Sequence, residues 1–206
     1  FDVDDTGGIG DGHVYMAWQI FGNEFFPATF NRSTDAAATW EPPVAVPEMP
    51  RFGTVEVGPD GGLYVIGESG GDFYLIRSDN AQDPGATPTF NQVTQVDLGG
   101  DQVTFSSLNP DGLLGQLWVA VDKSDGATRG NVYVLASVDP NGSADPLDVM
   151  FAKSTDGGAT FSEPVRVNDD PVDNGAAQWF GTLSVAPNGR IDVIWNDTRN
   201  DPTSNT

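Results

Sequence analysis

Short runs of alternating apolar and polar residues, separated by glycine-rich turns, recur along the whole chain. Residues 148–153 are rich in strand formers, and residues 164–167 alternate apolar with polar positions. Between them, residues 154–161 read Ser-Thr-Asp-Gly-Gly-Ala-Thr-Phe, which predicts a tight turn. Asp156 can accept hydrogen bonds from nearby backbone N–H groups, and the two glycines can take the positive φ that a reversal needs. We therefore expect a rigid hairpin corner at this point.

The same corner recurs twice upstream. Residues 33–40 read Ser-Thr-Asp-Ala-Ala-Ala-Thr-Trp, which keeps the polar pattern and the aromatic residue but loses the glycine. Residues 78–90 contain a degenerate copy with an insertion rich in proline and glycine. The corner positions of the three copies are Ser33, Asp35, Thr39 and Trp40; Ser78, Asn80, Thr89 and Phe90; and Ser154, Asp156, Gly158, Thr160 and Phe161.

A second repeat supplies the other strands. Residues 2–16 align without a gap to residues 120–134, and both read as strand, glycine-rich turn, strand. Shorter versions occupy residues 55–65 and 183–193. Joined to the corners, they predict four-stranded antiparallel units packed radially, as in an all-β β-propeller. The expected units are about 1–47, 50–97 and 105–168, with a half unit at 179–206.

The pattern Ser-x-Asp-x-Gly-x-Thr-aromatic resembles the Asp-box, or BNR repeat, of sialidase-like β-propellers in the glycosyl hydrolase superfamily. The resemblance implies that residues 1–206 form one partial propeller domain, with about three and a half blades of a six-bladed ring. It also implies a secreted or cell-surface protein. Because a half blade exposes an unpaired strand edge, we expect another protein segment to complete the ring, or assembly through the open edge.

Composition and charge narrow the possible partners. Among 206 residues, 25 glycines and 15 prolines suit many short strands and turns. A formal net charge of −21 repels phosphate backbones, so we expect no nucleic-acid partner. The chain has no cysteine and one histidine, which leaves no disulfide and no histidine cluster for zinc. No apolar run is long enough to span a bilayer, so no membrane span is expected.

Strand parity places a candidate ligand face at the end opposite the corners. Aromatic faces stack on sugar rings, arginine clamps a carboxylate, and aspartate accepts hydrogen bonds from hydroxyls. The candidate residues there are Arg51, Trp179, Trp195, Asp197 and Arg199. The alternative interpretation is that both tryptophans belong to the core between blades and that Arg199 pairs with Asp197 or Asp201.

The resemblance to sialidases also implies an arginine triad, a tyrosine–glutamate nucleophile pair and an aspartate acid/base. Arg51 and Arg199 are two candidate members of a triad, but no third arginine and no tyrosine fall in the loops of that face. Catalytic residues therefore stay unassigned. We favour a glycan-binding or structural and assembly module, with an exo-α-sialidase or related glycoside hydrolase completed by sequence outside this chain as the alternative.

Calcium is an open alternative to a protein without cofactors. Residues 2–7 carry oxygen ligands at alternating positions and a glycine at the sixth, like the start of an EF-hand loop, but His13 stands at the twelfth position. A second acidic loop covers residues 139–145. A solvated acidic surface explains both loops equally well and is the favoured interpretation. The candidate ligands are Asp2, Asp4, Asp139, Asn141 and Asp145.

Overall fold

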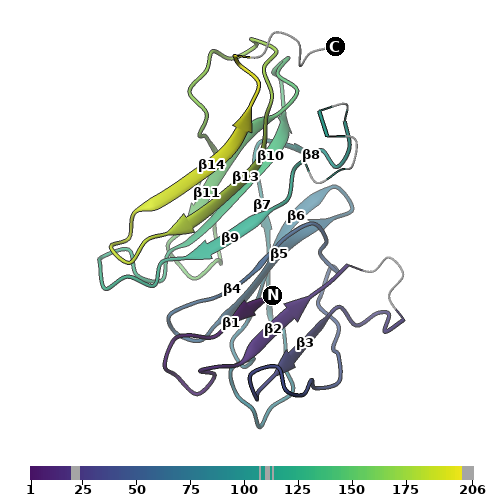
Figure 1. The fold of residues 1–206 in the computed structure, drawn as a ribbon, viewed down its shortest axis with the longest axis vertical. Coiled ribbons are helices and arrows are strands. Elements are labelled where there is room, and N and C mark those ends of the chain that lie inside the picture. Colours follow the sequence, from purple (N-terminus) through teal and green to yellow (C-terminus); the bar gives the residue numbers. More distant parts are fainter. Residues whose placement is uncertain (20–23, 107, 110–111, 113, 201–206) are drawn as a thin grey trace.

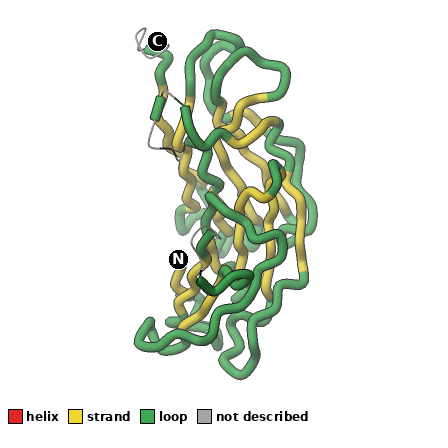
Figure 2. The backbone as a smooth tube through the Cα atoms, turned by 90° about the vertical axis from the view of Figure 1, so that its right-hand side faces the viewer, coloured by secondary structure: helices red, strands yellow, loops and turns green. Residues whose placement is uncertain are grey.

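The protein is all-β. A computed structural model describes residues 1–19, 24–106, 108–109, 112 and 114–200. Within these ranges every regular element is a strand, and the tube in Figure 2 shows strands and loops with no helix. The all-β fold class is therefore confirmed. The last six residues of the expected half unit and residues 20–23, which fall in the first expected unit, lie outside the described residues.

The strands are short, as the spacing of the turns predicts. They are β1 (Asp2–Val3), β2 (Val14–Ala17), β3 (Phe30–Ser33), β4 (Val55–Val57), β5 (Leu63–Ser69), β6 (Asp72–Ser78), β7 (Gln92–Val96), β8 (Gly100–Gln102), β9 (Trp118–Val121), β10 (Val132–Pro140), β11 (Asp148–Ser154), β12 (Val165–Arg166), β13 (Gln178–Val185) and β14 (Ile191–Asp197).

Strands that follow one another in sequence pair antiparallel within four sheets (Figure 1). The first sheet is β1-β2-β3, and a bridge from Phe30 to Val44 begins a fourth position. The second sheet is β4-β5-β6-β7. The third contains β9-β10-β11-β12, with β8 paired to the far end of β10. The last described sheet is the hairpin β13-β14.

Apolar clusters fill the junctions between consecutive sheets. Strands β5 and β10 are buried almost throughout, because both faces of their sheets are covered. This explains why their sequences are nearly continuous apolar runs. The first junction buries Tyr15, Phe30, Leu63 and Ile76; the second buries Ile66, Leu75, Val132 and Val134; the third buries Leu135, Val149 and Leu183. Consecutive antiparallel sheets packed face to face form the arrangement of a β-propeller.

Hydrogen bonds between equivalent polar positions hold all three corners. Asp156 accepts from the backbone N–H of Thr160 at 2.9 Å and from its hydroxyl at 2.6 Å. Asp35 accepts the same two bonds from Thr39 at 2.8 and 2.6 Å. In the degenerate copy Asn80 Oδ1 accepts both bonds from Thr89. The threonine hydroxyls and the turn's other donors lower the pKa of both Asp35 and Asp156 to about 2.

The first corner holds alanines where the third holds glycines. Ala36 and Ala37 have φ of 55° and 66°, in the left-handed region that disfavours residues with a Cβ atom. Gly157 and Gly158 occupy the equivalent positions with φ of 71° and 84°. A Cβ on Gly158 would lie 2.5 Å from Leu75 Cδ2 of the second sheet. The corner glycines therefore relieve backbone strain and also allow close packing between sheets.

A basic side chain crosses each of the first two junctions at the corner end. Arg32 on β3 donates through Nη1 to the carbonyl of Ala81 at 2.6 Å. Arg77 on β6 donates through Nη1 to the carbonyl of Gly157 at 3.3 Å. Ala81 and Gly157 are equivalent, because each directly follows the corner's Asn80 or Asp156. One sheet thus holds the corner of the next by the same carbonyl group.

Two features differ from the simple four-strand expectation. The outer strand of the first sheet is a single bridge at Val44, and Pro42 and Pro43 just before it have no N–H to donate to a ladder. β12 is only two residues long and follows Pro164. In addition, β8 was not predicted; it joins the third sheet at Val138–Pro140, beyond the part of β10 that β9 covers.

We predict that Ala37→Gly raises the free energy of unfolding by up to about 1 kcal/mol, because it removes left-handed strain from the first corner. Gly158→Ala should lower it by more than about 1 kcal/mol, since the new Cβ is strained and collides with Leu75. Urea denaturation of the two variants beside the parent measures both changes. A loss of stability in Ala37→Gly contradicts the equivalence of the corners.

Candidate functional site

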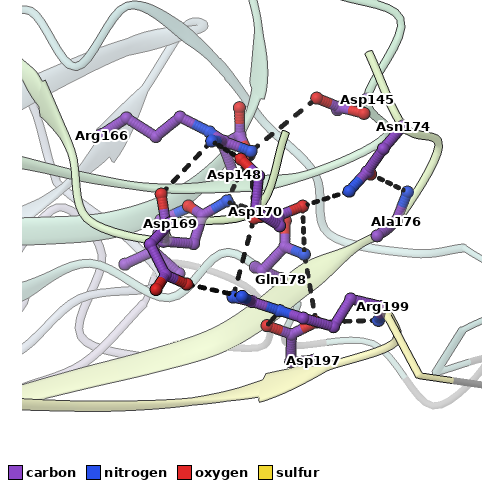
Figure 3. A network of polar contacts seen from close by, with 12 residues as sticks. Asp145, Asp148, Arg166, Asp169, Asp170, Asn174, Ala176, Gln178, Asp197 and Arg199 are labelled. Atoms are coloured by element: carbon purple, nitrogen blue, oxygen red, sulfur yellow. Dashed lines mark hydrogen bonds and ion pairs between the residues drawn. The ribbon is translucent and has the colours of Figure 1, made fainter. Parts of the chain in front are cut away.

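The candidate face lies where β13 begins and β14 ends. Gln178 pairs with Asp197 across the two strands, and the Thr198 hydroxyl accepts from the N–H of Ala177 at 2.8 Å. Ala177 also bridges to Leu147, just before β11. The connection from β12 to β13 is therefore held between the third sheet and the last, at the end opposite the Asp156 corner. Polar side chains from all four strands meet there (Figure 3).

Arg166 lies at the centre of the buried part of this network (Figure 3). Its Nε lies 2.8 Å from Asp148 Oδ1, and its Nη2 lies 3.1 Å from Asp170 Oδ1. The Nε–H does not point at Asp148, so this contact is an ion pair without a hydrogen bond. Asn168 donates to both carboxylates at 2.7 Å. The Asp148 and Asp170 side chains are only 3% and 1% exposed, so Arg166 is their main counter-charge.

Arg199 binds the outer part of the same network. Its Nε lies 2.7 Å from Asp197 Oδ2, and its Nη1 lies 2.5 Å from Asp169 Oδ1. Its Nη2 reaches Asp170 at 3.7 Å. Asp201, the other partner considered from the sequence, lies outside the described residues. The guanidinium group is thus engaged on three sides by the chain's own carboxylates.

The electrostatics keep these carboxylates ionised. Burial alone would raise the pKa of Asp170, but hydrogen bonds from Asn168 and Asn174 and the charge of Arg166 hold it below its ordinary value. Burial would also raise the pKa of Asp197, but hydrogen bonds from the Arg199 N–H and from Gln178 hold it below its ordinary value. Ionised carboxylates cannot donate protons at neutral pH. The network joins two sheets, and its Asp170 and Asp197 act in it as ionised acceptors.

Of the two candidate tryptophans of this face, only Trp195 shares a partner with Arg199. Trp195 packs in the apolar cluster of the third junction and donates through Nε1 to Asp197 at 3.2 Å. Trp179 is half-buried against Leu114, Leu147 and Ala177. The structure therefore brings Trp195, Asp197 and Arg199 together, and it packs Trp179 in a separate apolar cluster.

Arg51 lies in a separate place, before β4. Its Nε is 2.6 Å from Glu68 Oε2, and the other oxygen of Glu68 accepts from the N–H of Gly71 at 2.8 Å. Burial would raise the pKa of Glu68, but hydrogen bonds from Arg51 and from the Gly71 N–H hold it below its ordinary value. Arg51 also lines a cavity of about 240 Å³ with Trp18, Phe52 and Gln116.

The candidate calcium ligands have separate structural roles. Asp2 Oδ2 accepts from the N–H of Val57 on the next sheet, and Asp4 Oδ1 accepts two bonds from Thr6. Asp145 accepts from the N–H groups of Asp173 and Gly175. Asp139 is paired within the third sheet opposite Asp101, and the backbone N–H of Asn141 donates to the carbonyl of Gly99.

In the described ranges no three acidic, histidine or cysteine side chains form a group that could hold a metal ion. Calcium binding stays a prediction.

Sequence reasoning missed a charged pair in a cavity between the inner strands. The inner strands β4, β9 and β13 line a space of about 640 Å³. Lys123 Nζ lies there 2.9 Å from Glu56 and 3.1 Å from Asp5. Burial, followed by the charge of Asp2, raises the pKa of Glu56 to about 7 against the opposing charge of Lys123. In the sequence Glu56 is an ordinary polar position between two valines, so its inward direction follows only from the arrangement of the sheets.

Comparison with known proteins yields a distant likeness of shape. No protein-family model and no curated protein matches the chain. Among solved structures it is similar to the NanB sialidase from Streptococcus pneumoniae. A point mutant of that enzyme aligns with a TM-score of 0.44, and its complex with a chlorobenzylammonio-ethanesulfonate aligns with 0.43, each at 12% identity. The alignments cover 81% of this chain and 32% of the sialidase chain, so this chain spans about a third of that length.

In the part of the chain that the structure describes, no helix has the length and apolar character needed to cross a membrane.

We predict that Arg166→Met lowers the free energy of unfolding by about 3 kcal/mol, because it leaves the buried Asp148 and Asp170 without their counter-charge. Arg190→Met is the matched control, since Arg190 lies just before β14, is 68% exposed and, among the described residues, forms an ion pair only with Asp192. Its cost should stay under about 0.5 kcal/mol. Equal losses for the two variants in urea denaturation would show that the network adds nothing beyond a surface ion pair.

We predict that Glu56 makes stability fall as pH rises. Its folded pKa of about 7 lies above its ordinary value, so the folded state retains the proton and its contribution is lost as pH passes through about 7. Glu56→Gln mimics the protonated acid and should gain stability relative to the parent between about pH 5 and about pH 8. Thermal unfolding across this range checks the sign. A constant difference between the two proteins would place the Glu56 pKa outside the range.

Proposed function

We propose that this chain is a sialidase-like β-propeller module of a secreted or cell-surface protein, used for binding or assembly rather than for hydrolysis. The repeated corner with its Asp–Thr hydrogen bonds and the antiparallel sheets support the sialidase-like BNR architecture. The strongly acidic surface suits an extracellular setting. Its partners are then a carbohydrate or another protein segment that completes the propeller.

One observation carries the non-catalytic assignment. The chain has seven arginines, and each is in an ion pair with one of the chain's own carboxylates. A site for an acidic sugar needs guanidinium groups that turn toward the ligand. Arg199 would have to release Asp169 and Asp197 before it could bind a sugar carboxylate. The arginines of this chain therefore already make ion pairs within the protein.

The tyrosines support the same assignment. A tyrosine nucleophile needs an adjacent base or a lowered pKa. Burial instead raises the pKa of Tyr64 to about 12 and also raises that of Tyr15. The Tyr15 hydroxyl donates to the carbonyl of Ala81, whereas the hydroxyls of Tyr64 and Tyr133 accept from Arg77 and Asn131. Within the part of the chain that the structure describes, no tyrosine is hydrogen bonded to a glutamate.

We predict no turnover of a fluorogenic sialoside by the purified chain, measured beside an active sialidase as the positive control. Fluorophore release above the rate of a heat-denatured sample would overturn the proposal and favour the exo-α-sialidase alternative. Binding to sialylated and neutral glycans on an array then separates the two remaining roles. Binding that is lost in Arg199→Ala while the fold is retained would assign this face to a carbohydrate. If the chain binds no glycan, assembly is the role that the proposal retains.

A further inference from the structure

A cavity of about 440 Å³ lies at the corner end of the junction between the second and third sheets. The second sheet lines it with Asp60, Tyr64 and Arg77, and the third sheet lines it with residues 129–130 and 155–157. Each of these sheets has at least four described strands, so two complete sheets enclose the cavity. It lies at the opposite end of the sheets from the candidate face.

At the first junction a glutamine side chain occupies the equivalent place. Gln82 is the second residue after the corner's Asn80. Its Nε2 donates to the carbonyl of Asp60 at 3.1 Å. A Cβ atom on Gly61 would overlap Gln82 Oε1, and a Cβ atom on Gly10 would lie 3.0 Å from Gln82 Cβ. Gln82 therefore fills the space between the glycine-rich turns of the first and second sheets.

The second junction lacks this side chain. Gly158 is the second residue after Asp156, so it stands where Gln82 stands in the preceding corner. The turns beside the two places are equivalent as well. Gly61 and Gly130 have φ of 79° and 85°, and each lies two residues before the second strand of its sheet, β5 or β10. Because glycine has no side chain, the place that Gln82 fills at the first junction stays open at the second.

Several polar groups of the cavity wall have no partner. The carbonyl of Arg129 is equivalent to that of Asp60, and it accepts no hydrogen bond from any described residue. The Arg129 guanidinium donates only through Nη1, to carbonyls of its own turn, so its Nε and Nη2 have no acceptor within the described ranges. The Tyr64 hydroxyl accepts from Arg77 at 2.8 Å and donates to no described residue. One acceptor beside several donors is the complement of a carboxamide.

Charge favours a neutral amide over a carboxylate in this cavity. Arg77 already forms ion pairs with Asp60 and Asp79, at 2.8 and 2.6 Å. Asp156 also lines the cavity and is ionised, since its hydrogen bonds lower its pKa to about 2. A carboxylate would meet these aspartates and, at longer range, a net charge of −21. A carboxamide offers an acceptor and two donors without this repulsion.

The first junction also shows how the amide is presented. There Arg32 donates to three backbone carbonyls of the loop that carries Gln82, those of Ala81, Asp83 and Ala86. At the second junction Arg77 donates to one backbone carbonyl, that of Gly157. The second junction therefore lacks a loop as well as a glutamine, and a turn of another protein can supply both.

We infer that this cavity binds the side-chain amide of a glutamine that is presented by a turn of a partner protein. The amide nitrogen donates to the carbonyl of Arg129, as Gln82 donates to that of Asp60. The amide oxygen accepts from the unpartnered donors of the wall. This inference rests on the proposed role in binding and assembly, and it specifies the surface and the chemistry of the partner.

The probe for this cavity is the loop that fills the first junction. A backbone-cyclised peptide of residues 80–89 carries Gln82, and the ends of this loop already lie together because Asn80 Oδ1 accepts from the N–H and the hydroxyl of Thr89. Added to the ¹⁵N-labelled 206-residue chain, the peptide should shift the amide signals of Gly130 and Gly157 until they saturate. Absence of saturable shifts at these amides would overturn the inference.

A second peptide tests the amide itself. Gln82→Glu in the peptide replaces the amide by a carboxylate of nearly the same shape. It should bind roughly tenfold more weakly, because it loses the donor to the Arg129 carbonyl and gains a charge. Equal or tighter binding of this peptide would show that the Arg129 guanidinium recognises a carboxylate, and it would contradict the assignment of an amide.

Variants of the full chain locate the bound peptide. Arg129→Ala removes unpartnered donors and should weaken binding several-fold, whereas Arg190→Ala changes an exposed arginine outside the cavity and should bind as the parent does. Thr155→Trp places a bulky side chain at the rim and should also weaken binding, with folding retained because Thr155 is exposed. Unchanged binding by Thr155→Trp, or equal binding by the two arginine variants, would place the peptide elsewhere and overturn the inference.

These measurements fail separately from the test of the proposed function. Sialoside hydrolysis by the chain overturns the proposed function but does not affect binding of the peptide at the corner end. Failure of the peptide to bind overturns only the inference.

Discussion

The contact between a basic side chain and the corner of the following sheet is the interaction on which the arrangement depends. A guanidinium group can bind a carbonyl in the next sheet only if that carbonyl is held at a fixed place. The hydrogen bonds between the corner's Asp and the threonine fix it in the third corner, where the two residues after Asp156 have positive φ. Turn chemistry, backbone conformation and packing between sheets are therefore parts of one requirement. The buried position of Arg32, which is 1% exposed, follows from it.

The opposite end of the sheets is joined by a different kind of contact. There Arg166 and Arg199 neutralise carboxylates from the connection between β12 and β13 and from the start of β11 and the end of β14. A chain with 30 acidic and nine basic residues has few cations, and it places Arg32, Arg77, Arg166 and Arg199 at contacts between sheets. This use of charge explains how an acidic protein can keep polar groups between its sheets.

Local sequence patterns were sufficient for the all-β class and for the hairpins, because corner residues such as Asp156 act on neighbours within four positions. They were not sufficient for contacts between distant residues. Arg199 was a candidate for a ligand face because its contact with Asp169 cannot be read from the sequence. The two residues are 30 positions apart along the chain, yet Arg199 Nη1 lies 2.5 Å from Asp169 Oδ1. Glu56 was missed for the same reason, since only the approach of three sheets encloses it. The alignment of Arg32, Arg77 and Lys153 just before the corners was visible in the sequence, but its meaning required the neighbouring sheet.

Hydrogen exchange in an Arg77→Met variant tests most directly whether one sheet holds the corner of the next. Arg77 is on β6 of the second sheet, whereas the corner it contacts is formed by residues 154–161 of the third. The account predicts faster exchange of the Gly158 and Thr160 amides in this variant, with no change in an Arg190→Met control. Faster exchange confined to the second sheet, with the corner amides of the third unchanged, would contradict it.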